Sequence, residues 1–293
     1  MFWTRIRLTL EMIKFEHSIF ALPFALTGAL LAIRDGSLTG NLLWRKIAWI
    51  VVAMVCARSA AMAFNRLIDA DIDARNPRTK LRHIPAGLLS TGFSWAFVAV
   101  SSLIFIFAAR ELNTLCFRLA PVALGVIFAY SFTKRFTSFS HLVLGFALGI
   151  APAAAWIAIR GSLDARILWL TAAVTFWTAG FDIIYSCQDY EFDTDAGLFS
   201  LPRRLGVAGA LRVSRFLHAI MLACLLALVY TLQLGALSLA GIAVVAALLI
   251  YEHWLVKPDD LSRVNAAFFT MNGYVSVLFF LFWAADIFYG GAG

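Results

Sequence analysis

The chain has 293 residues, of which 62% are hydrophobic and 14% charged, and its formal net charge is +7. Apolar runs of about 20 residues, the helix length that crosses a bilayer core of roughly 30 Å, recur from end to end. These runs exclude an ordinary water-soluble class. The basic residues segregate by membrane side, so the positive charge indicates membrane topology rather than nucleic-acid binding. The four cysteines form no C-x2-C pair, which argues against a zinc site or a disulfide framework.

The apolar runs predict an all-α polytopic membrane protein. We expect nine spans, in chain order near 15–33, 47–68, 93–110, 114–133, 140–159, 167–187, 212–232, 236–256 and 265–288. The first run lacks a small-residue cleavage site, which favours a true span over a signal peptide. No linker or low-complexity stretch divides the chain, so we expect one membrane domain over 1–293.

Lysine and arginine are distributed unevenly between the two sides of this arrangement. With the N-terminus in the cytoplasm, the inner segments carry more than twice as many of them as the outer segments. This bias predicts a cytoplasmic N-terminus and an outer C-terminus, in the inner membrane of a bacterium. The long loops after the second and sixth spans then lie on the cytoplasmic face.

The second span ends in the pattern N-x3-D-x3-D, formed by Asn65, Asp69 and Asp73. On a helix of 100° per residue these side chains follow one another at about 40° steps, so they share one face, and Asp71 points elsewhere. Arg58 falls on the same arc, about ten residues inside the span. A cation at that depth should face a polar cavity rather than lipid, bonded either to a backbone carbonyl or to a substrate.

The sixth span ends in a second acidic stretch with the same spacing, seven residues and then four, formed by Asp182, Asp189 and Asp193. If the two helices turn these faces toward each other, five carboxylates and an amide share one pocket. Such carboxylates repel and stay ionised only beside cations. Mg²⁺ suits a set of oxygen ligands, and no His or Cys joins either motif. We therefore predict a magnesium ion holding a diphosphate. The neighbouring acids Asp71, Glu191 and Asp195 are expected to solvate helix ends.

Basic residues follow each motif and supply the complementary charge. They are Arg78, Lys80 and Arg82 after the first motif, Lys134 and Arg135 at the end of the fourth span, and Arg203 and Arg204 after the second motif. A metal together with Lys and Arg stabilises the charge that grows on a departing diphosphate. For Arg203 and Arg204 we favour a topology signal instead.

Two aromatic or polar side chains beside these motifs are further candidates. Tyr185 lies one turn from both Asp182 and Asp189, where its ring could steady a carbocation. His17 lies at the inner end of the first span. A polar residue there could contact the acceptor, or it could simply reflect the polarity of the membrane interface.

These segments together resemble the UbiA superfamily of intramembrane prenyltransferases over essentially the full chain. The resemblance is carried by Asn65–Asp73 (NRLIDADID), Arg78–Gly87 (RTKLRHIPAG), Tyr130–Arg135 (YSFTKR) and Asp182–Gly197 (DIIYSCQDYEFDTDAG). It implies nine transmembrane helices around a central cavity. It also implies metal–diphosphate ligands at Asn65, Asp69, Asp73, Asp189 and Asp193, with Asp182 beside them, and diphosphate contacts at Arg78, Lys80, Arg82 and Lys134.

Within that superfamily the chain looks like the 4-hydroxybenzoate polyprenyltransferase type. The stretches Lys14–Ala25 and Cys187–Asp193 look more like the branch of the futalosine route to menaquinone, which is thought to prenylate a dihydroxynaphthoate. His83 departs from the pattern, because quinone-forming members often have proline there.

The function implied is Mg²⁺-dependent transfer of a polyprenyl group from a prenyl diphosphate to an aromatic acid in quinone biosynthesis. Two alternatives remain open. One is a transferase of the same kind with a non-quinone acceptor, such as a glyceryl phosphate lipid, a haem or a chlorophyllide. The other is a membrane cation transporter, which would place its acids nearer the midplane on discontinuous helices.

Overall fold

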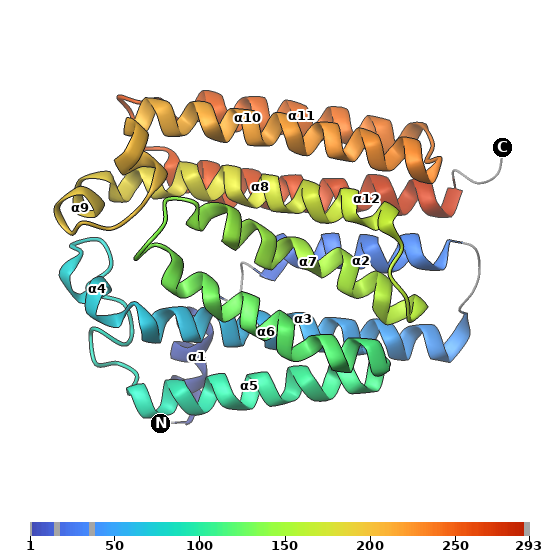
Figure 1. The fold of residues 1–293 in the computed structure, drawn as a ribbon, viewed down its shortest axis with the longest axis horizontal. Coiled ribbons are helices and arrows are strands. Elements are labelled where there is room, and N and C mark those ends of the chain that lie inside the picture. Colours follow the sequence, from blue (N-terminus) through green and yellow to red (C-terminus); the bar gives the residue numbers. More distant parts are fainter. Residues whose placement is uncertain (1, 15–17, 35–38, 290–293) are drawn as a thin grey trace. The chain divides into compact units, whose positions relative to one another are not determined.

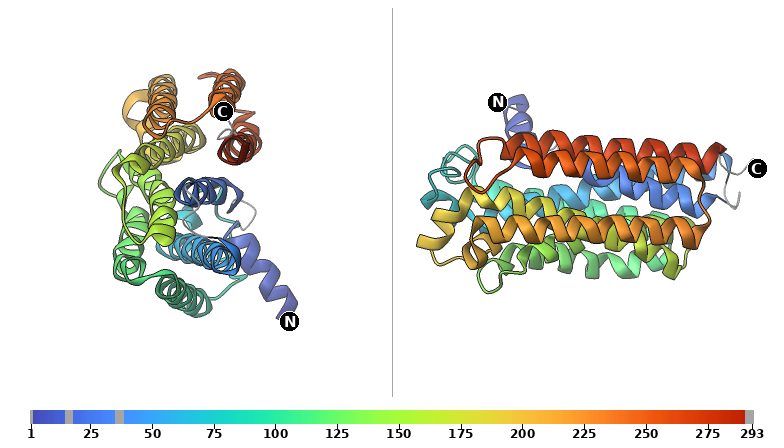
Figure 2. Two further views of the ribbon diagram at one scale, coloured as in Figure 1. Left: turned by 90° about the vertical axis from the view of Figure 1, so that its right-hand side faces the viewer. Right: turned by 90° about the horizontal axis from the view of Figure 1, so that it is seen from above.

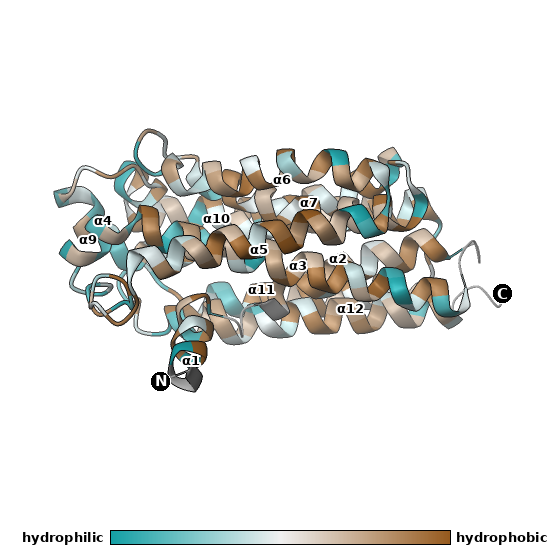
Figure 3. Cartoon of the chain, turned by 90° about the horizontal axis from the view of Figure 1, so that it is seen from below, coloured by the Kyte–Doolittle hydropathy of each residue, from teal (hydrophilic) through white to brown (hydrophobic). Residues whose placement is uncertain are grey.

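The computed structural model describes residues 2–14, 18–34 and 39–289, so His17 lies outside the described part. Every element named within these ranges is a helix, and the predicted all-α class is confirmed. Among the described residues, eight helices are long and apolar enough to cross a membrane, and the shorter apolar helix α2 (Ser18–Ile33) occupies the first predicted span. The structure is that of an integral membrane protein. In Figure 3 the long helices are largely brown, whereas the short helices α4 (Ala70–Arg75) and α9 (Tyr190–Asp195) are largely teal.

The chain divides into two compact units, which we describe separately. One unit comprises Met1–Ser18 and Ala48–Phe132, and the other comprises Ile19–Ile47 and Thr133–Gly293. The first contains α1 (Phe2–Met12), most of α3 (Gly40–Ile68), α4, α5 (Thr91–Leu112) and α6 (Thr114–Thr133). The second contains α2, α7 (Ser140–Arg160), α8 (Leu168–Ser186), α9, α10 (Leu201–Leu232), α11 (Ala236–Leu255) and α12 (Asn272–Tyr289) (Figure 1).

Two spans begin earlier than the hydropathy predicts. Helix α3 starts at Gly40 rather than near 47, and α10 starts at Leu201 rather than near 212. Arg203 and Arg204 therefore lie in the first turn of α10 and not in a loop. Ser200 is the reason for this early start, because its side chain accepts a hydrogen bond from the Arg203 amide and caps the helix.

An aromatic cluster holds the first unit together. The ring of Phe64 on α3 stacks on Phe128 of α6, with ring centroids 4.4 Å apart, and meets Trp95 of α5 edge-on at 5.7 Å. Beside it, Ile84 and Leu89 of the loop between α4 and α5 are buried in the same core cluster as Val98 of α5. Their burial ties this basic loop to the helices and so fixes its course.

Close backbone packing places α8 between α7 and α10 in the second unit (Figure 2). Gly145 and Gly149, one turn apart on α7, lie so near α8 that a Cβ on either would collide with Thr175. On the other side of α8, the Ser214 hydroxyl of α10 donates to the Gly180 carbonyl at 2.7 Å. Small residues let membrane helices approach this closely, and interhelical hydrogen bonds stabilise the contact.

Helices α11 and α12 pack as an antiparallel pair that is joined at one end by a buried acid. The carboxylate of Asp286 on α12 accepts hydrogen bonds from the Gly235 amide at 2.7 Å and the Ser238 hydroxyl at 2.9 Å. It thereby satisfies donors at the first turn of α11 that would otherwise be unpaired in the membrane.

Candidate active site

The first acidic motif lies at a backbone break. Helix α3 ends at Ile68, and Asp69 has φ −90° and ψ 0° before α4 begins at Ala70. This is the sparsely populated bridge region, in which active-site residues are often found. The prediction of one continuous helix through Asp73 is therefore wrong at Asp69. Helical hydrogen bonds nonetheless run from the Asp69 amide to the Asn65 carbonyl and from the Asp73 amide to the Asp69 carbonyl, so the shared face is kept.

The side chains of this motif are buried. Asp69 is 2% exposed and Asp73 is 3% exposed, whereas Asp71 is exposed as the helical spacing predicts. The Asn65 amide nitrogen donates to Asp69 Oδ2 at 3.0 Å. Buried carboxylates are costly unless they are paired or bind a cation, so this burial singles out the predicted pair.

Arg82 forms the partner of the buried Asp73. One guanidinium nitrogen donates to Asp73 Oδ1 at 2.7 Å and to Oδ2 at 2.8 Å. The loop folds back to allow this, because the Thr79 hydroxyl donates to the Asp73 carbonyl and the Arg82 amide donates to the Thr79 carbonyl. In this structure Arg82 therefore orients an aspartate. The other basic residues predicted here lie in different environments: Arg78 and Lys80 are exposed, and Arg58 on α3 is half-buried.

The second acidic motif repeats the break of the first. Helix α8 ends at Ser186, a single 3-10 turn covers Cys187–Asp189, and α9 follows as a helix of six residues. Asp189 has φ −98° and ψ 8°, close to the values of Asp69. In both motifs the first aspartate of D-x3-D directly precedes a short helix that carries the second aspartate, but a 3-10 turn separates α8 from α9, whereas α3 ends next to Asp69. The two motifs belong to different units.

A histidine that the sequence patterns did not single out contacts this second motif. His141, at the start of α7, has its Nδ1 2.7 Å from Asp182 Oδ2, and the residue is only 4% exposed. The contact joins α7 to α8 across 41 positions. The available signal was a titratable residue at the inner end of an otherwise apolar span.

The loop after α9 brings Lys134 and Asp193 into the same region. The Phe199 amide donates to the Lys134 carbonyl at 2.9 Å, and the Leu198 amide donates to the Asp193 carbonyl at 3.0 Å. Lys134 and Asp193 are close enough to interact electrostatically. Arg135, the next residue, is exposed. Lys134, which was expected only as a diphosphate contact, therefore lies beside Asp193 of the second motif.

Tyr185 belongs to a row of aromatic side chains along α8. Trp177, Phe181 and Tyr185 follow one another at four-residue steps, with Trp177 and Phe181 ring centroids 4.9 Å apart. Phe268 packs edge-on against Phe181, with ring centroids 5.3 Å apart, and its ring is tilted against that of Tyr185 at 4.2 Å. The row ends one turn before Asp189, so the second motif adjoins an aromatic surface.

The sequence patterns also missed a buried polar network deeper in the second unit. Asn272 accepts from the Trp177 indole at 2.8 Å and donates to Glu252 Oε1 at 3.0 Å. Glu252 and Asn272 are both 0% exposed. This network joins α8, α11 and α12 beside the π-helical turn η4 (Ala266–Met271). It was missed because Glu252 and Asn272 are isolated polar residues without a recurring spacing.

The chemistry of the first motif fits the metal that its sequence implies. Its donors are the oxygens of two carboxylates and an amide, and Mg²⁺ prefers oxygen ligands. Within the described residues, no group of three or more His, Cys, Asp or Glu side chains is placed to hold a metal by itself. Each D-x3-D motif alone provides only two carboxylates. A magnesium ion at either motif would thus need oxygens from waters or from a bound phosphate, as Mg²⁺ commonly has in phosphate-transfer sites.

The long apolar helices, with acidic and basic groups gathered at two of their ends, are those of an integral membrane protein with a polar site. The chain belongs to the UbiA prenyltransferase family, whose model matches residues 21–274, and it is a prenyltransferase. Curated relatives are 4-hydroxybenzoate octaprenyltransferases. The protein of Vibrio atlanticus (strain LGP32) is 29% identical, over 80% of this chain and 83% of its own length. The protein of Paraburkholderia phytofirmans (strain DSM 17436 / LMG 22146 / PsJN) is 29% identical over 94% and 96%.

Solved structures share the fold. The apo structure of a UbiA homolog from Aeropyrum pernix K1 is 35% identical, with a TM-score of 0.82 over 91% of this chain and 96% of that one. A UbiA homolog from Archaeoglobus fulgidus bound to GPP and Mg²⁺ is 21% identical, with a TM-score of 0.73 over 96% and 99%. At that identity the second comparison supports the fold alone.

Proposed function

We propose that this prenyltransferase moves a polyprenyl group from a prenyl diphosphate to an aromatic acid, either 4-hydroxybenzoate or a dihydroxynaphthoate, in quinone biosynthesis. The observation that carries the proposal is the similar backbone conformation of Asp69 and Asp189, each of which directly precedes a short helix with the second aspartate of its motif. Two acidic motifs of similar local shape, each followed by basic residues, suit the two ends of one metal–diphosphate group. The 4-hydroxybenzoate octaprenyltransferase relatives favour the first acceptor.

Asn65, Asp69, Asp73, Asp189 and Asp193 are the residues that would hold Mg²⁺. When bound, the metal would neutralise diphosphate charge and stabilise the leaving group. The hydrogen bond from Asn65 to Asp69 and the bidentate contact of Arg82 with Asp73 hold two of these carboxylates in fixed orientations before substrate arrives. Ligands that are already oriented lose less freedom on binding.

Lys134, Arg78, Lys80 and Arg135 are the candidates to donate to the diphosphate oxygens. As the carbon–oxygen bond of the prenyl diphosphate breaks, its electron pair stays on the diphosphate, and these cations stabilise the added negative charge. The prenyl carbon becomes an allylic cation. A ring carbon of the acceptor attacks it to form the new carbon–carbon bond, and the ring then loses a proton. The aromatic row that ends at Tyr185 is suited to stabilise the cation by cation–π attraction and to keep water away.

A direct assay tests this function. Purified protein is incubated with Mg²⁺, a radiolabelled prenyl diphosphate and a panel of aromatic acids, and both diphosphate release and prenylated product are measured. The proposal expects both with at least one quinone precursor. Release without a prenylated acid indicates a non-quinone acceptor. An intact prenyl diphosphate in every reaction contradicts the transferase and favours the transporter.

We also propose that the two motifs and the N-terminus face the cytoplasm, on the basis of the lysine and arginine bias. Single cysteines introduced at the exposed positions Arg75 and Leu163 lie on opposite sides in this orientation. A membrane-impermeant thiol reagent added to whole cells should label Leu163→Cys and spare Arg75→Cys. The reverse pattern would invert the topology.

A further inference from the structure

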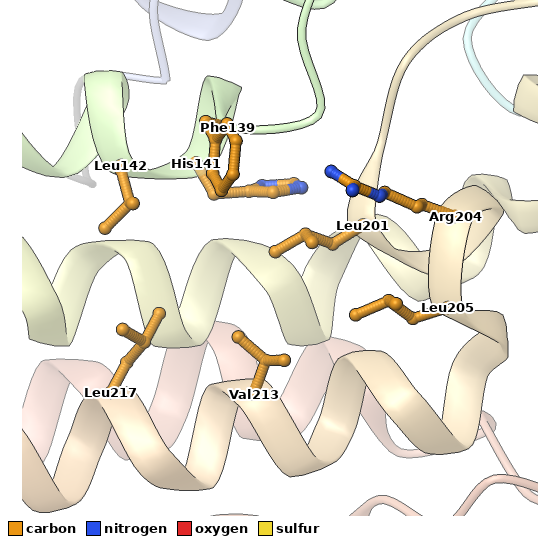
Figure 4. A pocket seen from close by; sticks show the side chains of 8 residues that line it. All are labelled: Phe139, His141, Leu142, Leu201, Arg204, Leu205, Val213 and Leu217. Carbon is orange, nitrogen blue, oxygen red and sulfur yellow. The ribbon is translucent and has the colours of Figure 1, made fainter.

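A groove in the second unit lies outside the residues assigned above to prenyl transfer. Its volume is about 260 Å³. Most of its lining is apolar, and the exceptions are His141 of α7 and Arg204 of α10 (Figure 4). The apolar lining residues are Phe139, Leu142, Leu201, Leu205, Val213 and Leu217. The groove is therefore apolar with a basic group at one end.

A glycine break in α10 shapes this groove. Gly206 has φ 69° and ψ 165°, so the first turn of α10, which carries Arg204 and Leu205, bends relative to the rest of the helix. Beyond the break, Val213 and Leu217 continue along the groove. From Val213 to Leu217 the helix rises about 6 Å, at 1.5 Å per residue, so this side of the groove can contact one stretch of an acyl chain.

Two nitrogen-bearing groups converge at the polar end. The ring nitrogens of His141 and the guanidinium of Arg204 point toward one another across the groove (Figure 4). Nδ1 of His141 contacts Asp182, and Nε2 is buried with no hydrogen-bond partner among the described residues. An unsatisfied buried polar atom is costly, so this geometry favours a bound group that can pair with Nε2. When Nδ1–H donates to Asp182, Nε2 accepts, so a bound head group that offers an anionic oxygen to Arg204 and a hydroxyl to Nε2 satisfies both residues.

We propose that this groove binds an anionic phospholipid, with the head group between Arg204 and His141 and an acyl chain along Val213 and Leu217. The apolar lining favours a lipid over free phosphate, because inorganic phosphate would leave most of the groove uncovered. The charge of α10 favours an anionic lipid: the helix carries Arg203, Arg204, Arg212 and Arg215 and no Asp or Glu. Each arginine near a membrane surface attracts anionic lipid by about 1 kcal/mol.

The position of His141 gives this lipid a link to the second acidic motif. His141 lies between the groove and Asp182, so a head group on Nε2 holds the imidazole from the side opposite the carboxylate. The lipid thereby orients the histidine that contacts Asp182. This role makes His141 a positioning residue.

Lipid retention is the test, because it does not depend on turnover. The protein is delipidated in detergent and returned to nanodiscs of phosphatidylcholine and phosphatidylglycerol, and the lipids retained after mild re-extraction are counted by native mass spectrometry. The wild type should retain one phosphatidylglycerol in excess over the nanodisc composition. Arg204→Gln should lower that enrichment about fivefold, which corresponds to ~1 kcal/mol for one arginine. Arg203→Gln is the matched control, since its guanidinium donates to the Leu198 carbonyl, and it should retain the enrichment.

A second variant tests the apolar part of the groove. Val213→Trp fills the groove without changing its charge and should also abolish the retention of phosphatidylglycerol. If tryptophan impairs folding, the smaller substitution Val213→Phe is used instead. If Arg203→Gln and Arg204→Gln lowered the phosphatidylglycerol enrichment equally, the lipid would be attracted by the basic surface in general and not by this groove, which would overturn the proposal. Retention in both Val213 variants would overturn it as well. Displacement of the lipid by millimolar inorganic phosphate, with no effect of the Val213 variants, would identify a phosphate site and not a lipid groove.

Discussion

Arg82 donates from one guanidinium nitrogen to both carboxylate oxygens of Asp73, at 2.7 and 2.8 Å. The side chain of Asp73 is 5% exposed and that of Arg82 is 25% exposed, so the pair is largely shielded from water. Removing one partner of such a pair leaves an uncompensated buried charge. The contact changes the role expected for Arg82, from binding the proposed diphosphate to orienting an aspartate of the proposed metal site.

We expect Arg82→Gln to lower prenyl transfer by about 10–100-fold, the range typical of groups that orient metal ligands. The loss should be partly rescued by raising the Mg²⁺ concentration, because the variant weakens a carboxylate ligand. Steady-state rates across a Mg²⁺ titration measure both effects. Arg75→Gln is the control, since Arg75 is exposed and donates to the Asp71 carbonyl on the same short helix. A loss in Arg82→Gln that no Mg²⁺ concentration relieves would assign Arg82 to the diphosphate instead.

The burial of Asp69 and the exposure of Asp71 provide a matched pair within one motif. Asp69→Asn should reduce turnover on the order of a hundredfold or more, because it removes a carboxylate that would hold the metal, and the metal in turn stabilises the negative charge that grows on the departing diphosphate. Asp71→Asn should change turnover little. Both variants keep side-chain size, and thermal unfolding in detergent checks that both fold. Similar turnover in the two variants would remove Asp69 from the site.

A double substitution asks whether the two motifs serve one substrate. If Asp69 and Asp189 act on the same metal–diphosphate group, the variant Asp69→Asn/Asp189→Asn should lose far less than the product of the two single losses, since groups that act as a unit are not additive. Turnover of the wild type, both single variants and the double variant completes the cycle. Asp195→Asn, at an exposed position after the second motif, is the control partner. If the losses from the Asp69 and Asp189 substitutions multiplied fully in the double variant, the two motifs would act independently of each other.

The oxygen-only donor set predicts the response to metal removal. Chelation with EDTA should abolish prenyl transfer, and Mg²⁺ should restore it, whereas Zn²⁺ should restore it poorly because neither motif includes His or Cys. Diphosphate release in metal-depleted buffer is the measurement. Full turnover in the presence of excess EDTA would exclude a metal role for both motifs.

The close approach of α7 and α8 predicts a stability effect at Gly149. A Cβ there would lie 2.7 Å from the Thr171 carbonyl oxygen, which is backbone and cannot rotate away. Gly149→Ala should therefore destabilise the protein by about 1–3 kcal/mol, the usual cost of overpacking. Gly125→Ala on α6 is the control, because no described atom beyond its own stretch of helix lies within 4 Å of the place that an added Cβ would take. The unfolding midpoints of the two variants are compared in one detergent. Equal midpoints would show that α7 can move away from α8 to make room for the added methyl group.

Much of the architecture follows from local composition. Hydropathy identifies the spans because a segment in lipid must be apolar and must pair its backbone hydrogen-bonding groups within its own helix. This requirement depends on the composition of that segment alone. The acidic motifs stand out for a related reason: carboxylates such as Asp69 and Asp189 are rarely placed beside apolar runs without a function. The class of protein and the candidate ligands were therefore predictable from the order of residue types.

Contacts between distant segments were decided by tertiary packing. The sequence contains both His141 and Asp182, but their contact exists because glycines let α7 lie close against α8. The backbone break at Asp69, the bond from Arg82 to Asp73 and the network around Glu252 likewise depend on which surfaces pack together. Side-chain periodicity describes one helix at a time, whereas a hydrogen bond across many positions requires the spatial placement of two.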